Sequence, residues 1–197
     1  MGLRERKKQR QRDTVERTAL DLFARQGYEQ TTVHDICEAA EVGHATFYRY
    51  FATKEDVVFA NRDDYLGALA DMIERSAGPL PESMVHNVMV AFAGYLAGDN
   101  AQPARDDLAR SNARLSEHAL TIEREWEDTL ARGIAARAGD REPDLGQHLQ
   151  AAAAMVVLRF ARAERAAHPA GPTLAQLVDS SLTEWDVYFA DPNELAP

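Results

Sequence analysis

Apolar residues recur along the chain at intervals of three and four positions, and this spacing predicts an all-α protein. A helix brings every third or fourth residue to one face, whereas a half-buried strand alternates apolar and polar positions. We find no segment that alternates in this way. Stretches rich in glycine and proline interrupt the helical pattern, so we expect about nine helices and no sheet.

The N-terminal part of the chain predicts three helices. The first begins near Asp13, which forms a capping-box-like pair with Glu16, and it ends at Gly27. The second follows Thr32, and the third covers about 44–50. Two short helices joined by a tight turn are typical of a helix-turn-helix.

Longer helices fill the rest of the chain. The fourth begins at Thr53 and continues to about Ser76. The eighth contains eight consecutive apolar residues, 151–158, and we expect it to be buried on all sides. The pattern thus divides the chain into a helix-turn-helix domain with a basic N-terminal arm, residues 1–55, and a second helical domain, residues 56–197.

Composition excludes several classes of protein. The one cysteine, Cys37, cannot form an intrachain disulfide, and no Cys/His cluster has the spacing of a structural zinc site. The chain has no signal-like apolar stretch and no apolar run of membrane-spanning length. We therefore expect a cytoplasmic protein that uses no metal, no cofactor and no membrane.

An enzyme is not indicated. The chain has no Gly-rich phosphate loop, no G-x-S-x-G elbow and no H-E-x-x-H motif. Its six histidines do not pair at metal-ligand spacing on a helix. We expect no catalytic residue.

The charge distribution favours nucleic acid although the net charge of −10 does not. The first twelve residues hold one acid, Glu5, and six cations, namely Arg4, Arg6, Lys7, Lys8, Arg10 and Arg12. We expect this arm to be disordered without DNA and to add affinity more than specificity. The alternative is a solubilising tail or a targeting-like patch.

The third predicted helix carries the candidate chemistry. Phe47 and Phe51 are spaced to face inward, which turns His44, Ala45, Thr46, Tyr48 and Arg49 outward. Alanine and threonine are small enough for a major groove, and tyrosine hydroxyls can donate to phosphates. The alternatives are an ordinary helical bundle and a helical module that binds protein and no specific DNA.

A longer stretch resembles the DNA-binding signature of the TetR family of repressors: residues 31–36, 39–43, 46–51 and 54–57, with Phe23, Gly27 and Tyr28 upstream. The resemblance implies that Thr32 and Gly43 begin helices near the DNA backbone. It implies that His44, Ala45, Thr46 and Arg49 face the groove and that Tyr48, Tyr50 and Lys54 hold phosphates. The chain departs from the family at Glu41, where glycine is commoner, and at Gly43, where serine is commoner.

The family resemblance implies a repressor that binds a palindromic DNA operator as a homodimer and is released by a small-molecule effector. It places the dimer interface on the last two helices, where the candidates are Ala151, Ala154, Leu177, Leu182 and Trp185. The alternative is that these residues fill the core of one chain.

The effector pocket is expected among inward faces of the C-terminal helices. Its candidate walls are Met72, Met89, Phe92, Leu96, Ile122, Trp126, Met155 and Leu158. Residues 105–139 also resemble TetR-type regulators of the mycofactocin group, which implies an acyl-CoA-like effector whose phosphates would meet Arg105, Arg110 or Arg114. The alternative is that these arginines pair with nearby acids on a solvated face.

Overall fold

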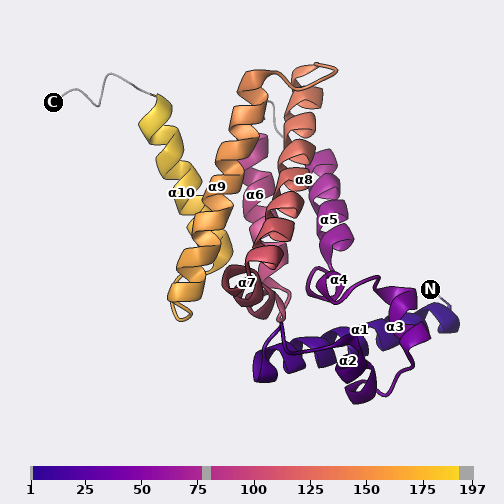
Figure 1. Cartoon of the computed structure of the whole chain (residues 1–197). Helices are drawn as coiled ribbons and strands as arrows, with labels where there is room; N and C mark the ends of the chain where they lie inside the picture. The colour runs from indigo at the N-terminus through magenta and orange to yellow at the C-terminus, as the bar shows by residue number, and fades with distance from the viewer. Residues whose placement is uncertain (1, 77–80, 191–197) are drawn as a thin grey trace. The chain divides into compact units, whose positions relative to one another are not determined.

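The computed structural model describes residues 2–76 and 81–190, apart from the side chains of 81, 82 and 185–190. All regular elements in these ranges are α-helices, which confirms the predicted fold class (Figure 1). They are α1 Leu3–Gln26, α2 Val33–Ala39, α3 His44–Tyr50, α4 Lys54–Val58, α5 Arg62–Arg75, α6 Pro81–Ala97, α7 Gln102–Ser111, α8 Ala113–Ala138, α9 Leu145–Ala167 and α10 Leu174–Ala190.

The helices pack into two compact units. Unit 1 is the chain up to Arg62 together with Ala101–Leu120, and unit 2 is Asp63–Asn100 together with the chain from Thr121 onward. Packing thus groups α7 and the start of α8 with the N-terminal helices, which the sequence pattern did not indicate. A functional boundary at residue 55 stays a prediction.

The N-terminal arm is helical, which corrects the expectation of disorder and of a helix start near Asp13. α1 begins at Leu3, and the backbone N–H of Arg6 already donates to the carbonyl of Gly2 at 3.1 Å. Arginine, lysine and glutamine are good helix formers, so this segment continues the helix. Asp13 accepts a hydrogen bond from the Gln9 amide at 2.8 Å and lies in the helix interior.

Local capping follows the sequence closely. At the end of α1, Gly27 adopts a positive φ of 88°, and its N–H donates to the carbonyl of Phe23. At the start of α2, the Thr32 hydroxyl accepts from the Asp35 N–H at 3.2 Å, and the Asp35 carboxylate accepts from the Thr32 N–H at 2.8 Å. These hydrogen bonds from the Thr32 backbone and side chain hold the pKa of Asp35 below its usual range.

The predicted fourth helix is broken, and this is why ten helices occur where about nine were expected. α4 ends at Val58 and α5 begins at Arg62. Between them, the Phe59 ring stacks on His118 at a centroid distance of 4.6 Å, and the carbonyl of Ala60 accepts from the Arg12 guanidinium. Tertiary contacts and the local turn bond from the Arg62 N–H to the Phe59 carbonyl, at 3.0 Å, thus meet at the break.

A buried ion pair joins α7 to α1 inside unit 1. Arg105 is 4% exposed and its guanidinium donates to the carboxylate of Glu16. Burial lowers the pKa of Arg105 to about 10, which still leaves the side chain charged at neutral pH. Glu16 therefore compensates a cation that has been removed from water, so removing either partner alone would be costly.

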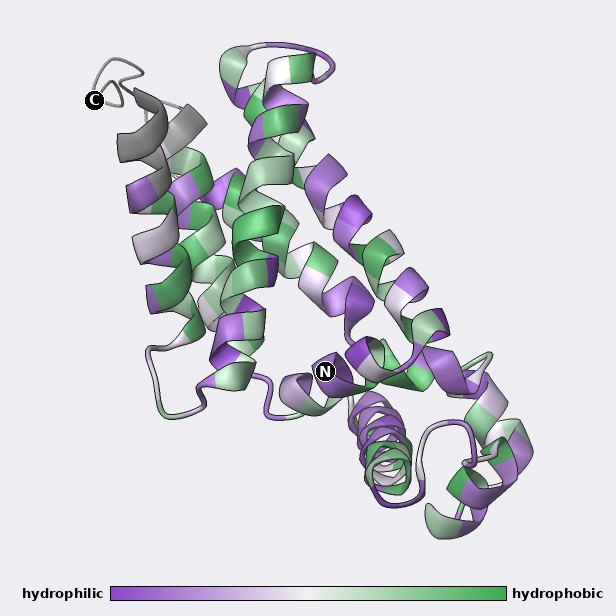
Figure 2. Cartoon of the chain, turned by 60° about the vertical axis from the view of Figure 1, so that its left-hand side comes forward, coloured by the Kyte–Doolittle hydropathy of each residue, from purple (hydrophilic) through white to green (hydrophobic). Residues whose placement is uncertain are grey.

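Unit 2 is a helical bundle in which α10 packs against α6 and α9. Its fully buried side chains include Leu69, Met84, Met89, Phe92, Leu96, Leu130 and Ile134. The Trp126 ring meets Phe92 and Tyr65 edge to face at 5.1 and 6.2 Å. Hydrophobic colouring follows α9 along most of its length, whereas the start of α1 is hydrophilic (Figure 2).

The expectation that 151–158 is buried on all sides is wrong. Val156 is 38% exposed, and Phe160 one turn later is 71% exposed. Neighbouring helices of the same chain cover one side of α9 and leave this side in water. Among the parts of the chain that the structure describes, no helix is both long and apolar enough to cross a membrane.

Candidate nucleic-acid interface

Two phenylalanines fix the orientation of α3. Phe47 is fully buried and Phe51 nearly so, with ring centroids 5.7 Å apart. Both belong to the core of unit 1, which also holds Val15, Phe23 and Ile36. Because α3 is only seven residues long, anchoring this side leaves the opposite side to solvent.

The turn between α2 and α3 is a Schellman motif closed by a strained residue. The N–H of Val42 donates to the carbonyl of Cys37 at 2.9 Å, and the N–H of Glu41 donates to the carbonyl of Glu38 at 3.2 Å. Glu41 occupies the left-handed position with φ 54°. This is the position at which the family resemblance implied glycine.

Gly43 caps α3 without a side chain. Its extended backbone places its carbonyl to accept from the N–H groups of Thr46 and Phe47 at 2.8 and 3.1 Å. Glycine costs only a few tenths of a kcal/mol at this position relative to serine or threonine. The missing hydroxyl is therefore a small perturbation.

The residues predicted to face DNA are distributed over the solvent side of α3. We call His44, Ala45, Thr46, Tyr48 and Arg49 the recognition face; all are exposed except Thr46, which is half-buried. Tyr48 is the most prominent aromatic residue, at 56% exposure. The face contains no acidic residue, and the side chains of Ala45 and Thr46 at its centre are small.

His34 was missed at the sequence level. It lies on α2, exposed, and its ring stacks on that of His44 with centroids 5.6 Å apart and planes 13° apart. The two residues come together only because the turn folds α2 against α3, so spacing within either helix gave no signal. The stack restricts the orientation of the His44 imidazole.

Gln11 of α1 was also missed. Its side-chain carbonyl accepts hydrogen bonds from the Tyr50 hydroxyl at 3.0 Å and from the Arg49 guanidinium at 3.4 Å. The guanidinium also donates to the Tyr50 oxygen at 3.2 Å. These three side chains tie the C-terminal end of α3 to α1.

Lys54 is engaged within unit 1. Its ammonium donates to the carbonyls of Tyr28 and Thr31 at 2.9 and 3.2 Å and lies 4.2 Å from the centre of the Tyr28 ring. It thus joins the loop before α2 to the start of α4. Thr32, which was expected near the DNA backbone, begins α2 directly after this loop and is exposed.

Comparisons with known proteins agree with this geometry. The model of the family described as bacterial regulatory proteins, tetR family, matches residues 17–60, which contain α2, the turn and α3. The chain is 39% identical over 149 residues to the HTH-type transcriptional regulator TcmR of Streptomyces glaucescens, with 70% of this chain and 65% of TcmR covered. The chain belongs to the TetR family.

Other TetR-family proteins resemble this chain at lower sequence identity. The mycofactocin biosynthesis transcriptional regulator MftR of Mycobacterium tuberculosis is 22% identical over 128 residues, covering 64% of this chain and 65% of MftR. The chain thus spans just under two thirds of both TcmR and MftR. A TetR-family regulator from Syntrophomonas wolfei superposes with a TM-score of 0.72 at 17% identity, covering 95% of this chain and 99% of that one. The FadR repressor of Thermus thermophilus, solved with lauroyl-CoA, superposes with a TM-score of 0.56 at 20% identity. The superposition covers 94% of this chain and 98% of FadR.

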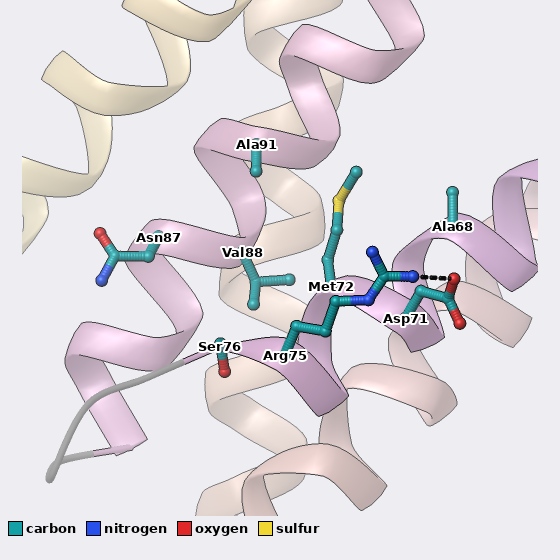
Figure 3. Close-up of a pocket in the computed structure, with 8 residues that line it drawn as sticks. All are labelled: Ala68, Asp71, Met72, Arg75, Ser76, Asn87, Val88 and Ala91. Carbon is teal, nitrogen blue, oxygen red and sulfur yellow. Dashed lines mark hydrogen bonds and ion pairs between the residues drawn. The ribbon is translucent and has the colours of Figure 1, made fainter.

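A pocket of about 410 Å³ opens between α5 and α6 in unit 2 of this TetR-family chain. Its lining residues are Ala68, Asp71, Met72, Arg75, Ser76, Asn87, Val88 and Ala91. Figure 3 shows Arg75 turned toward Asp71, to which it donates at 2.6 Å. Of the predicted pocket residues, Met72 lines this space, and the other seven are buried in the core of unit 2: Met89, Phe92, Leu96, Ile122, Trp126, Met155 and Leu158.

Three of the five candidate dimer residues are buried in unit 2. Ala151, Ala154 and Leu182 are buried, and Leu177 is half-buried. The side chain of Trp185 lies outside the described residues. The exposed apolar residues of α9 are instead Leu145, Leu149, Val156 and Phe160.

The arginines considered for effector phosphates have local partners. Arg105 pairs with Glu16, Arg110 with Asp107, and Arg114 with Glu55 at 3.1 Å. All three belong to unit 1, whereas the residues that line the pocket belong to unit 2. Arg110 pairs with Asp107 on a solvated face as the alternative interpretation expected, whereas Arg105 is buried and pairs with an acid of α1.

Replacing Glu41 with glycine should stabilise the protein. A non-glycine residue in the left-handed region costs roughly 1–2 kcal/mol, and the entropic cost of glycine offsets roughly 0.5–1 kcal/mol of this. We expect Glu41→Gly to raise the free energy of unfolding by about 0.5–1 kcal/mol in urea denaturation. Glu38→Gly, on the exposed side of α2, is the control and should lower it by a similar amount. If both substitutions lowered the free energy of unfolding equally, the inference that Glu41 is strained would be wrong.

Proposed function

We propose that this chain is a transcription repressor that binds operator DNA through α3. The observation that carries the proposal is the recognition face. It faces solvent because Phe47 and Phe51 occupy the opposite side of α3, and it contains no acidic residue. Small residues at its centre suit the width of a major groove, and Tyr48 and Arg49 offer donors for phosphates and base edges. TcmR and MftR are named as transcriptional regulators, which supports the same class of function.

The repressor acts as a homodimer through the exposed side of α9. Leu145, Leu149, Val156 and Phe160 are separated by four, seven and four residues, which places them within about 60° on one side of the helix. Ala152, on the same line, permits close helix approach. A second copy covers this stripe because an identical apolar surface complements it under two-fold symmetry. Two recognition helices then read the two halves of a palindrome.

A small molecule bound in unit 2 releases the operator. The pocket between α5 and α6 has a volume within the usual range for ligand sites. FadR of T. thermophilus was solved with lauroyl-CoA, and this precedent favours an acyl-CoA-like effector.

Adding one acid to the recognition face tests DNA binding. Ala45→Glu should weaken binding to the gene's own upstream region at least tenfold, because a carboxylate would face phosphates and bases. An acid near the start of a helix is favourable for folding, so lost binding would not reflect lost structure. Ala113→Glu, in the first turn of α8 and also exposed, is the control and should bind as wild type does.

Fluorescence anisotropy at several salt concentrations provides the measurement. The wild-type protein should prefer its operator over a scrambled duplex and lose affinity steeply with salt. A helical module that binds only protein would leave every duplex unbound at low salt. That outcome, or equal binding by Ala45→Glu and wild type, would sink the repressor interpretation.

Charging the α9 stripe tests the dimer. Phe160→Arg should give monomers in sedimentation experiments, because it would bury an unpaired cation between two copies. Leu120→Arg, at an exposed leucine of unit 1, is the control and should leave the dimer intact. A wild-type chain that sediments as a monomer, or a dimeric Phe160→Arg, would exclude this interface.

Thermal unfolding with palmitoyl-CoA tests the effector class. We expect palmitoyl-CoA to raise the Tm by a few degrees and free CoA to leave it unchanged, because ligand binding stabilises the folded state. Ala91→Phe narrows the pocket and should abolish the shift, whereas Ala97→Phe, on the same helix but outside the pocket lining, should retain it. No difference between the acylated and free forms would discard the acyl-CoA proposal.

A further inference from the structure

The first turns of α1 extend beyond the core of unit 1. Residues 2–10 are all exposed, and the first buried residue of α1 is Val15. This part of the helix is nevertheless continuous with the packed part, because α1 runs unbroken from Leu3 to Gln26. Its cations therefore have positions fixed by helical geometry.

Gln11 stands where the extension meets the core. Its side-chain carbonyl is held by the Tyr50 hydroxyl and the Arg49 guanidinium, both from the C-terminal end of α3. The cation of Arg12, the next residue, contacts the Phe51 ring at 5.7 Å and the carbonyl of Ala60. The side of α1 that carries Gln11 is thus the side nearest the end of α3.

Helical periodicity divides the cations of the extension into two sets. Arg4, Lys7 and Lys8 lie within about 60° of Gln11 around the helix axis, whereas Arg10 and Arg6 lie about 100° and 140° away. Positions 4, 7 and 8 are seven, four and three residues before Gln11, which is the spacing of one helix face. The extension therefore presents a cationic ridge in line with Gln11.

We propose that Arg4, Lys7 and Lys8 form a phosphate-binding ridge that contacts the DNA backbone beyond the segment read by α3, and that Gln11 positions this ridge. The inference rests on the proposed function, because it assigns these side chains to the DNA that α3 binds. Gln11 acts through Tyr50 and Arg49, so it is a positioning residue.

The dimensions fit this role. At a rise of about 1.5 Å per residue, Arg4 lies roughly 10 Å along the helix from Gln11, and one DNA strand carries a phosphate about every 3.4 Å of axis. The ridge therefore covers a few phosphates next to the recognition helix. Duplex DNA is the partner because the ridge is joined to α3 through Gln11, whereas a membrane-binding patch would need no such tie.

Two charge-matched double variants test the ridge. Arg4→Gln/Lys7→Gln removes two cations from the Gln11 side, and Arg6→Gln/Arg10→Gln removes two from the other side. Each phosphate contact contributes about 0.9 to the slope of log affinity against log salt. We expect the first variant to reduce that slope by nearly 2 and to bind about tenfold more weakly at moderate salt, while the second reduces it by less than 0.5. A flexible tail would make the two variants equal.

A third substitution tests Gln11. Gln11→Leu has a similar size but cannot accept from Tyr50 or Arg49, so it should loosen the connection between the ridge and α3 while α1 stays helical and the charges stay in place. In that background, the two double variants should reduce the slope by similar amounts. Circular dichroism confirms that helix content is unchanged.

The outcomes separate this inference from the proposed function. A wild-type protein that binds no duplex overturns the repressor interpretation and the ridge together. A wild-type protein that binds its operator, with equal slopes for the two double variants, overturns the ridge alone. Retention of the difference in the Gln11→Leu background overturns the positioning role of Gln11.

Discussion

Burial of Phe47 is the constraint on which the proposed DNA-binding surface depends. A helix of seven residues has no stability of its own in water, because isolated helices shorter than about 12–15 residues are marginal. Burying one phenylalanine contributes roughly 1.5–3 kcal/mol, and Phe47 is buried completely. The same contact that makes α3 a helix also decides which side of it faces solvent.

Hydrogen bonds within unit 1 then limit which side-chain donors of the proposed surface are available to DNA phosphates. The Lys54 ammonium has three donors and uses two of them on the carbonyls of Tyr28 and Thr31, which leaves one for a phosphate. Tyr50 gives its only proton to Gln11, so it can donate to a phosphate only by exchanging partners. Tyr48 carries no such constraint among the described contacts, and its hydroxyl is the better-placed donor.

Sequence predicted the local features of this fold and missed the tertiary ones. The cap at Thr32 and the stop at Gly27 were predictable because the interacting groups lie within four residues. Arg12 contacts the Ala60 carbonyl at the break after Val58 from 48 positions away, and the Tyr50–Gln11 bond joins residues 39 positions apart, so periodicity could not find either contact. The start of α1 was misplaced because Asp13 looks like a cap, although its carboxylate bonds one turn back.

The apolar pattern of α9 illustrates a different limit. Periodicity identified a helix that is apolar nearly all round, but it cannot say whether the covering surface comes from the same chain or from another copy. The structure shows which side the same chain covers: Ala151 and Ala154 are buried, whereas Val156 and Phe160 are exposed. The family resemblance predicted an interface on the last two helices, and the stripe that we propose for the dimer lies on the exposed side of the first of these, α9.

The buried pair of Arg105 and Glu16 joins α7 to α1 inside unit 1. Removing one partner of a buried ion pair costs roughly 3–5 kcal/mol, because the other charge is left buried and unpaired. The chain passes between the units at residues 62–63, 100–101 and 120–121, the last of these inside the continuous helix α8. α7 thus belongs with α1 in unit 1 through a side-chain contact between residues 89 positions apart, although α7 lies between two segments of unit 2 in the sequence.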